Sequence, residues 1–174
     1  MMQFQAGDDA AAGPSAGKYT WSDVESRGRA MHEIRTEIDI GASSARVWNV
    51  LTDFAEYPNW NPFVKSIAGQ AEKGTRLVAR IVPEGGRGMT FKPTVLVADQ
   101  EKELRWLGRF LVPGLFDGEH YFVIESNPAG TTRLVHGERF SGLLAMLASS
   151  RLDRDTRRGF IAMNKALKAR AEAS

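Results

Sequence analysis

Strand-length runs at hairpin spacing fill the middle of this chain, and one long run of helical period follows them. Short stretches rich in Gly, Pro, Asn and Asp separate the strand-length runs, as tight antiparallel connections require. The six runs occupy residues 63–71, 75–82, 89–98, 103–108, 118–126 and 131–140. Parallel strands need long crossover connections, so this spacing predicts an antiparallel meander.

Another strand and a short helix precede these runs. Residues 32–40 (HEIRTEIDI) place Ile34, Thr36, Ile38 and Ile40 on one face and charged side chains on the other, which predicts a half-buried strand. After Gly41, Ser43 or Ser44 can cap a helix over the segment ARVWNVL. Two X-Pro pairs then predict repeated turns between residues 53 and 63.

The last part of the chain, from about residue 142 to residue 171, has helical period. Its apolar stripe contains Leu144, Leu147 or Ala148, Leu152, Thr156, Phe160, Met163 and Leu167. The arginine-rich stretch RLDRDTRR suggests a nucleic-acid or anionic-membrane surface, but Asp153 and Asp155 interrupt it. We therefore expect the polar side of this helix to be an ordinary solvated face.

Together these patterns predict an α+β fold. We expect a seven-stranded, antiparallel, curved sheet around a long C-terminal helix, with two short helices after the first strand. A strongly bent sheet cannot contact a straight helix along its whole length, so such folds tend to leave a cavity between the two. The predicted use of that space is binding.

Composition limits the other possibilities. The chain has 174 residues, of which 43% are hydrophobic and 25% charged, as expected for one globular domain over residues 31–174. Residues 1–18 are small, polar and punctuated by Gly and Pro, and we expect a flexible extension over residues 1–30. With no cysteine, a net charge of +2 and no long apolar run, we expect a cytoplasmic protein without nucleic-acid binding or stable membrane insertion.

Four segments resemble the SRPBCC superfamily, also described as START-like or Bet v 1-like. They are ARVWNVLTDFAEYPNWNPFV, LVPGLFDGEHYFVIE, TRLVHGERFSGLL and RRGFIAMNKALKARAE. Within that superfamily, the chain is similar to the bacterial polyketide cyclase/dehydrase-like group from about residue 32 to its end. The resemblance implies a helix-grip fold in which seven strands hold the C-terminal helix over a mainly apolar pocket. Members include lipid carriers, hormone receptors, polyketide cyclases and chaperone activators.

The segment DFAEYPNWNPF contains four aromatic rings, two prolines and two asparagines in eleven residues. In helix-grip folds this segment lies near one end of the cavity. Phe54, Tyr57 and Trp60 can therefore plug the core, while Asn61 and Pro62 direct the chain into the next strand. We favour this structural role, and direct ligand contact by Trp60 or Asn61 is the alternative.

The last hairpin places ionisable side chains together. A loop at residues 127–131 sets Glu125 opposite Arg133, which leaves His120 opposite Glu138 on the other face of the sheet. If that face is the concave one, His120, His136 and Glu138 enter an apolar space, where a carboxylate needs a partner. The pair is predicted to lie within hydrogen-bond reach, either as an acid/base couple or as a structural and ligand-orienting pair, which we favour.

Other residues complete the predicted site. The expected ligand-binding set is Trp60, Asn61, Trp106, Phe122, His136, Phe140, Leu144 and Phe160. We expect no metal, because His32, His120 and His136 lack metal-ligand spacing, and no cofactor, because no cofactor motif is present. The glycine-rich stretch PEGGRG is predicted to be a hairpin tip, and VPGLF either caps the core or covers the cavity.

Three functions fit these observations. We favour binding of a hydrophobic or aromatic small molecule, lipid-like or polyketide-like, beneath the C-terminal helix. The first alternative is a polyketide cyclase or dehydratase that uses His120 and Glu138 for proton transfer. The second is a protein-interaction module of the chaperone-activator type, with the basic outer face of the last helix as its contact surface. The sheet edge or VPGLF could also mediate a homodimer.

Overall fold

The structure is a computed structural model that describes residues 32–82, 87–110, 116–142 and 150–173. The predicted extension at residues 1–30, Leu144, and most of PEGGRG and VPGLF lie outside the described residues. The described elements are, in order, β1 (His32–Ile40), α1 (Ser44–Thr52), the 3₁₀-helix η2 (Phe54–Glu56), α2 (Tyr57–Trp60), β2 (Val64–Ala68), β3 (Val78–Ile81), β4 (Met89–Phe91), β5 (Thr94–Asp99), β6 (Glu103–Phe110), β7 (Phe116–Ser126), β8 (Thr132–Ser141) and α3 (Ser150–Glu172).

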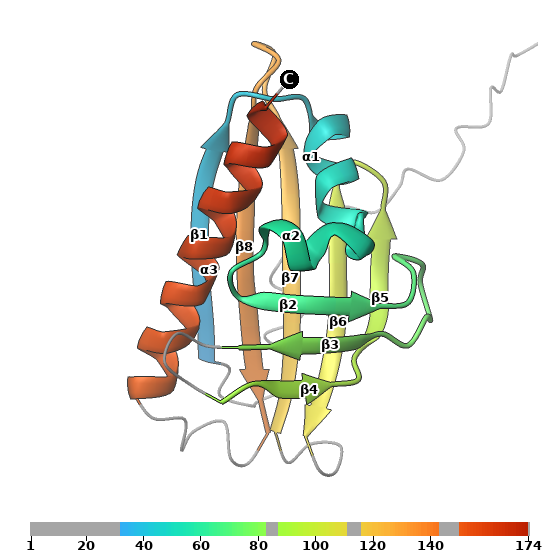
Figure 1. Cartoon of the computed structure of the whole chain (residues 1–174), viewed down its shortest axis with the longest axis vertical. Helices are drawn as coiled ribbons and strands as arrows, with labels where there is room; N and C mark the ends of the chain where they lie inside the picture. Colours follow the sequence, from blue (N-terminus) through green and yellow to red (C-terminus); the bar gives the residue numbers. More distant parts are fainter. Residues whose placement is uncertain (1–31, 83–86, 111–115, 143–149, 174) are drawn as a thin grey trace, which may run out of the picture.

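The strands form an antiparallel arrangement in two parts. Five strands pair in the order β1-β8-β7-β6-β5, and β2, β3 and β4 pair in sequence order. In Figure 1 the three short strands cross in front of the long ones, and α3 runs alongside β1 and β8. The predicted α+β class, with an antiparallel curved sheet and a C-terminal helix, is confirmed.

The described residues contain eight strands where seven were predicted, because the expected strand 89–98 is divided. The division falls at Lys92 and Pro93, and a proline cannot donate the next ladder hydrogen bond. The two parts of the sheet remain joined beyond this point: Gly74 N donates to Val95 O at 2.8 Å, and Leu77 N donates to Pro93 O at 2.8 Å. The sheet therefore bends sharply at Pro93.

The start of the domain matches its predicted local structure. β1 pairs with β8 along its whole length, from His32 opposite Phe140 to Ile40 opposite Thr132. Ser43 is the N-cap of α1, and its side chain accepts a hydrogen bond from Arg46 N at 3.3 Å. A capping oxygen of this kind satisfies one of the first free N–H groups of a helix.

The β7–β8 hairpin has the predicted register. Glu125 is opposite Arg133, Phe122 is opposite His136, and His120 is opposite Glu138. Its outer face carries the ring of Tyr121, which lies across Gly137 of β8 and donates to Glu33 Oε1 at 2.9 Å. The ring covers the glycine, which has no side chain of its own to pack there.

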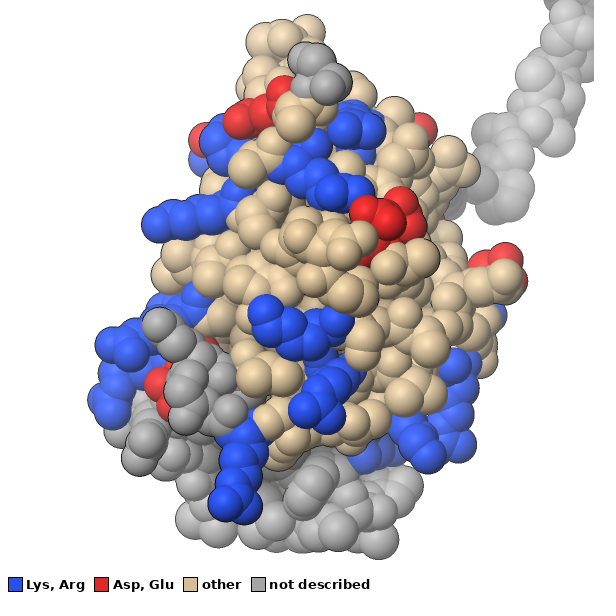
Figure 2. Space-filling view, viewed as in Figure 1, with Lys and Arg blue, Asp and Glu red and all other residues tan. Residues whose placement is uncertain are grey.

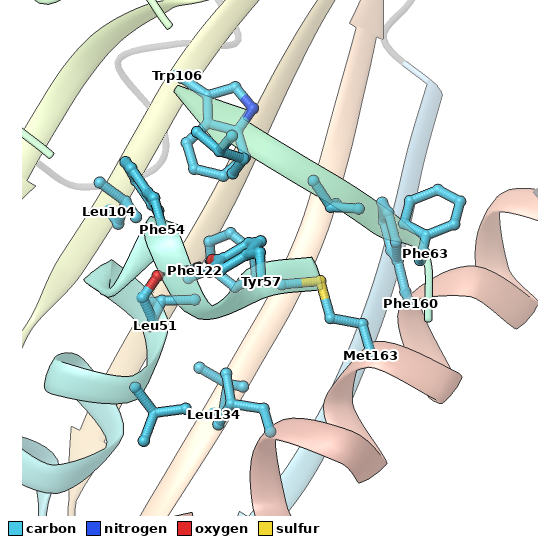
Figure 3. Packing of buried hydrophobic residues seen from close by; sticks show 14 of the residues in the cluster. Leu51, Phe54, Tyr57, Phe63, Leu104, Trp106, Phe122, Leu134, Phe160 and Met163 are labelled. Carbon is cyan, nitrogen blue, oxygen red and sulfur yellow. Dashed lines mark hydrogen bonds between the residues drawn. The ribbon is translucent and has the colours of Figure 1, made fainter. Parts of the chain in front are cut away.

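The inner face of the sheet packs against α3, α1 and the segment before β2. The buried stripe of α3 includes Thr156, Phe160, Met163 and Leu167, as predicted. Figure 3 shows Phe160 and Met163 of α3 approaching Phe63, Tyr57 and Phe122 in the centre of the core. This core contains the residues that form the candidate site.

Candidate functional site

The inner face of β7 and β8 brings two histidines and a glutamate together. His120 and His136 are buried, with 3% and 0% of their surface exposed. Nε2 of His136 lies 2.9 Å from Nε2 of His120, so one of the two nitrogens donates a proton to the other. This direct contact between the histidines was not part of the sequence prediction.

Further hydrogen bonds connect this histidine pair to α3 and β1. Nδ1 of His136 lies 2.7 Å from Oδ1 of Asn164, and Nδ2 of Asn164 donates to Oγ1 of Thr36 at 3.0 Å. Thr36 in turn donates to the backbone oxygen of His136 at 3.0 Å. We call Glu138, His120, His136, Asn164 and Thr36 the polar chain. Because its histidine, amide and hydroxyl groups are hydrogen-bonded to one another, their burial costs little.

Glu138 stands at the other end of the polar chain. Its Oε2 lies 3.8 Å from Nδ1 of His120, so the predicted approach within hydrogen-bond reach is wrong by this geometry, although the two groups share one face. The side chain of Glu138 is 21% exposed, against 4% for that of His120. The carboxylate therefore keeps some solvation and does not depend wholly on His120.

Glycines surround this carboxylate. Gly118 of β7 pairs with Gly108 of β6 on the inner face, one row beyond Trp106, His120 and Glu138. A β-carbon at Gly118 would come 2.5 Å from Oε1 of Glu138. The carboxylate of Glu138 thus occupies the space over Gly118, whereas a β-carbon at Gly108 would meet only the backbone oxygen of Gly118, at 3.8 Å.

Aromatic rings enclose both imidazoles. Trp106 stacks on His120 with ring centroids 4.9 Å apart and an interplanar angle of 11°. Phe160 and Phe122 stack on His136 at 4.0 and 4.4 Å. Burial, together with neighbouring His120, holds the pKa of His136 well below its usual value, although the hydrogen bond with Asn164 acts in the opposite direction. His136 is therefore neutral near pH 7.

The aromatic segment before β2 has structural contacts. Oδ1 of Asn61 accepts from Phe63 N at 3.0 Å and from Val64 N at 2.8 Å, so its side chain directs the chain into β2. Tyr57 packs against Phe54 and Trp60 and donates to Leu51 O at 2.7 Å. Nδ2 of Asn61 and Nε1 of Trp60 are buried without a hydrogen-bond partner among the described residues.

The predicted ligand-binding residues fall into two groups. His136 is a member of the polar chain, and Trp106, Phe122 and Phe160 pack against its two imidazoles. Phe140 lies at the edge of this group, opposite Gly118 and stacked on His32 at 6.2 Å. Trp60 and Asn61 belong to the aromatic segment, apart from the hydrogen-bonded chain. The structure thus brings most of the set around one polar feature.

Asn164 and Thr36 are the members that the sequence reasoning missed as site residues. Thr36 was correctly placed on the buried face of β1, but only as a core residue. Asn164 follows Phe160 by four residues and so falls on the apolar stripe of the last helix. A carboxamide on an apolar stripe could have indicated a buried hydrogen-bonding site, because a buried amide needs partners.

The basic side chains of α3 bear on the alternative of a protein-interaction surface on this helix. Lys and Arg form several separate groups over α3 and β2–β4 in Figure 2. Arg157, Lys168 and Arg170 donate to backbone or carboxylate oxygens of other segments, at 3.0, 2.7 and 2.7 Å.

Among the described residues, no cluster of three or more His, Cys, Asp or Glu could hold a metal ion. No helix in the same part of the chain is long and apolar enough to cross a membrane.

Comparisons with known proteins agree with the observed fold. A family model described as "Polyketide cyclase / dehydrase and lipid transport" matches residues 31–172. The fold is similar to the Zhui aromatase/cyclase from Streptomyces sp. R1128, with a TM-score of 0.67, 19% identity and coverage of 82% of this chain and 94% of that one. No curated protein matches the sequence.

Two further solved structures share the fold. A START superfamily protein from Mycobacterium smegmatis aligns with a TM-score of 0.66 and 19% identity over 81% of this chain and 97% of that one. A hypothetical protein from Helicobacter pylori aligns with a TM-score of 0.69 and 18% identity over 92% of this chain and all of the other. At these identities the likeness concerns the fold alone.

Proposed function

Because this chain belongs to the polyketide cyclase/dehydrase and lipid transport family, within the SRPBCC superfamily, we propose that it binds a hydrophobic or aromatic small molecule between its sheet and α3. The ligand would lie against Trp106 and the Gly108–Gly118 pair, with an oxygen-bearing group directed toward Glu138 and His120. Trp60, Asn61 and Phe140 are proposed as further ligand contacts, as is Leu144, which lies outside the described residues.

The polar chain is the observation that carries this proposal. A core that served packing alone would need no buried histidine pair, since apolar side chains fill the same volume without desolvating polar groups. The polar chain instead runs from β1 through α3 to Glu138. The side chain of Glu138 is more exposed than that of His120. Mostly apolar walls with a few convergent polar groups are typical of small-molecule sites.

A second candidate function is catalysis by the His120–Glu138 pair, as in a cyclase or dehydratase. The two side chains stand 3.8 Å apart on one face of the sheet, which is the arrangement that two groups acting on one reacting molecule would need. In a cyclisation, one group would take a proton from a carbon beside a carbonyl. That carbon would then bond to a second carbonyl carbon, and the resulting alkoxide would receive a proton from the other group.

Native mass spectrometry of protein purified from its natural host tests the binding proposal. A bound lipid, polyketide or aromatic compound, released on denaturation, is the expected result. Titration with N-phenyl-1-naphthylamine, a neutral aromatic dye, provides an affinity even for ligand-free protein. Trp106→Ala is expected to weaken dye binding at least several-fold, whereas His32→Gln, at the strand edge, should leave it unchanged. The absence of both a copurified compound and dye binding would reject the proposal.

The variant His120→Gln separates the two functions. Binding alone predicts that affinity for the identified compound survives this change. Catalysis predicts that turnover of that compound falls steeply while its binding largely persists, because the lost interaction acts in the transition state. A compound that is recovered unchanged after incubation with the wild-type protein would argue against the catalytic candidate.

A further inference from the structure

The hydrogen bonds of the polar chain have a determinable direction, starting from Thr36. A hydroxyl has one proton to donate, and a backbone carbonyl can only accept. Thr36 Oγ1 lies 3.0 Å from the backbone oxygen of His136, so its proton is used in that bond. Toward Asn164, therefore, the Thr36 oxygen can act only as an acceptor.

This requirement orients the amide of Asn164. The atom that faces Thr36 at 3.0 Å must be the donating nitrogen, which leaves Oδ1 facing Nδ1 of His136 at 2.7 Å. A carboxamide oxygen has no proton to donate. Nδ1 of His136 therefore carries a proton.

The remaining proton positions follow from the neutrality of His136. Burial lowers the pKa of His136, so its second ring nitrogen, Nε2, is unprotonated and accepts. The proton between the two rings, 2.9 Å apart, then belongs to Nε2 of His120. One ring nitrogen of the pair remains without an assigned proton, namely Nδ1 of His120, and it faces Glu138.

We propose that Asn164, held in place by Thr36, is a positioning residue that sets the tautomers of both buried histidines, so that Nδ1 of His120 is where the polar chain gains or loses a proton. Every other hydrogen-bonding position along the chain from His120 to Thr36 is already filled by one proton. A proton added there lies on the side of the imidazole that faces the Glu138 carboxylate, 3.8 Å away.

The consequence for ligands rests on the proposed function. With neutral His120, Nδ1 is an acceptor, so the ligand group that fits beside it is a donor such as a hydroxyl or an enol. With a proton on Nδ1, the same atom is a donor that fits a ligand carbonyl. Asn164 hydrogen-bonds to His136 and Thr36, so it acts on His120 and Glu138 through His136.

Nitrogen-15 NMR of the histidine rings tests the tautomers directly in ligand-free protein. In the wild type we expect the proton of His136 on Nδ1 and a proton of His120 on Nε2. In Asn164→Leu the acceptor for His136 Nδ1–H is lost, and we expect both rings to reverse. Reversal is favoured because His120 would then donate Nδ1–H toward the Glu138 carboxylate.

Thr156→Val is the matched control, since Thr156 is also a buried polar residue of α3 but lies outside the polar chain. It should leave both tautomers as in the wild type. Thr36→Val removes the hydroxyl that orients the amide, and we expect a mixture of forms at His136. If Asn164→Leu does not fold, the wild-type spectrum and Thr36→Val still decide.

Two results would overturn the proposal: a wild-type His136 protonated on Nε2, or wild-type tautomers in a folded Asn164→Leu variant. Both are read without any ligand. The absence of both a bound compound and dye binding would therefore reject the proposed function and leave the tautomer assignment standing. Reversed tautomers in the wild type would reject the tautomer assignment and leave the proposed function standing.

Discussion

The carboxylate of Glu138 lies in space that only a glycine at residue 118 leaves free. A β-carbon at residue 118 would come 2.5 Å from Oε1 of Glu138, whereas one at Gly108 would meet no described atom closer than the backbone oxygen of Gly118, at 3.8 Å. The two glycines are direct partners across β6 and β7. They therefore form a matched pair in which one substitution disturbs the acidic end of the polar chain and the other does not.

Gly118→Ala is expected to move the carboxylate away from His120 without unfolding the protein, because the end of a glutamate side chain can rotate. The free energy of unfolding should change by less than about 1 kcal/mol, since alanine itself is tolerated in strands. The ring nitrogen signals of His120 should shift in Gly118→Ala and stay unchanged in Gly108→Ala. Equal spectra for the two variants would contradict this prediction.

The stability of the protein should decrease on acidification because of His136. In the unfolded chain a histidine has a pKa of about 6.5, while burial and His120 lower the pKa of His136 in the folded state. Below about pH 6.5 the unfolded state therefore binds a proton that the folded state does not. Stability should fall with decreasing pH in this window, by at most about 1.4 kcal/mol per pH unit.

Urea unfolding at about pH 7.5 and about pH 5.5 measures this contribution. His136 is faced by His120 from β7 and by Asn164 from α3. His136→Phe keeps an aromatic ring against Phe160 but cannot titrate, so its loss of stability between the two pH values should be smaller. Thr156→Val, which changes a buried residue of α3 that has no ionisable group, should keep the wild-type difference. The same pH dependence in His136→Phe would show that other groups cause it.

Gly159 allows α3 to approach the chain entering β2. A β-carbon at residue 159 would overlap the ring of Phe63, which packs edge-on against Phe160 at 5.7 Å. Gly159→Ala gains about 1 kcal/mol of helix propensity but overpacks the core at a cost of about 1 to 3 kcal/mol. We expect a net destabilisation of about 1 kcal/mol.

The double variant Gly159→Ala, Phe63→Leu tests the cause. Leucine leaves more room at residue 63, so the double variant should be more stable than the sum of the two single changes implies. Urea unfolding of the four proteins in this cycle gives the coupling energy. Additive effects would indicate that Gly159→Ala acts through the helix and not through Phe63.

Asn61 is expected to act mainly through the backbone of the β2 entry. Asn61→Ala leaves Phe63 N and Val64 N without their buried acceptor and should cost about 1 to 3 kcal/mol of stability. Asn61→Asp keeps an acceptor at the same place and should lose less. If Asn61→Ala instead keeps wild-type stability while binding of N-phenyl-1-naphthylamine falls, Asn61 acts on the ligand.

Much of the fold could be predicted because its causes are local in sequence. The alternation in residues 32–40, the cap at Ser43 and the loop at residues 127–131 each depend on neighbouring residues, and β1, α1 and the β7–β8 register have the expected form. The division at Pro93 was missed. Its proline was visible, but the bend also depends on pairing between residues 74–77 and 93–95.

The candidate site could be predicted only where one hairpin contains it. Sequence pattern alone determined that His120, His136 and Glu138 share a strand face, because side chains alternate with a period of two and the loop sets the register. Only the tertiary structure decided that the two histidines contact each other, that Glu138 lies 3.8 Å from His120, and that Asn164 and Thr36 complete the chain. The contact between Asn164 and Thr36 joins residues 128 positions apart. The distances within the polar chain depend on how α3 packs into the bent sheet, which no local pattern specifies.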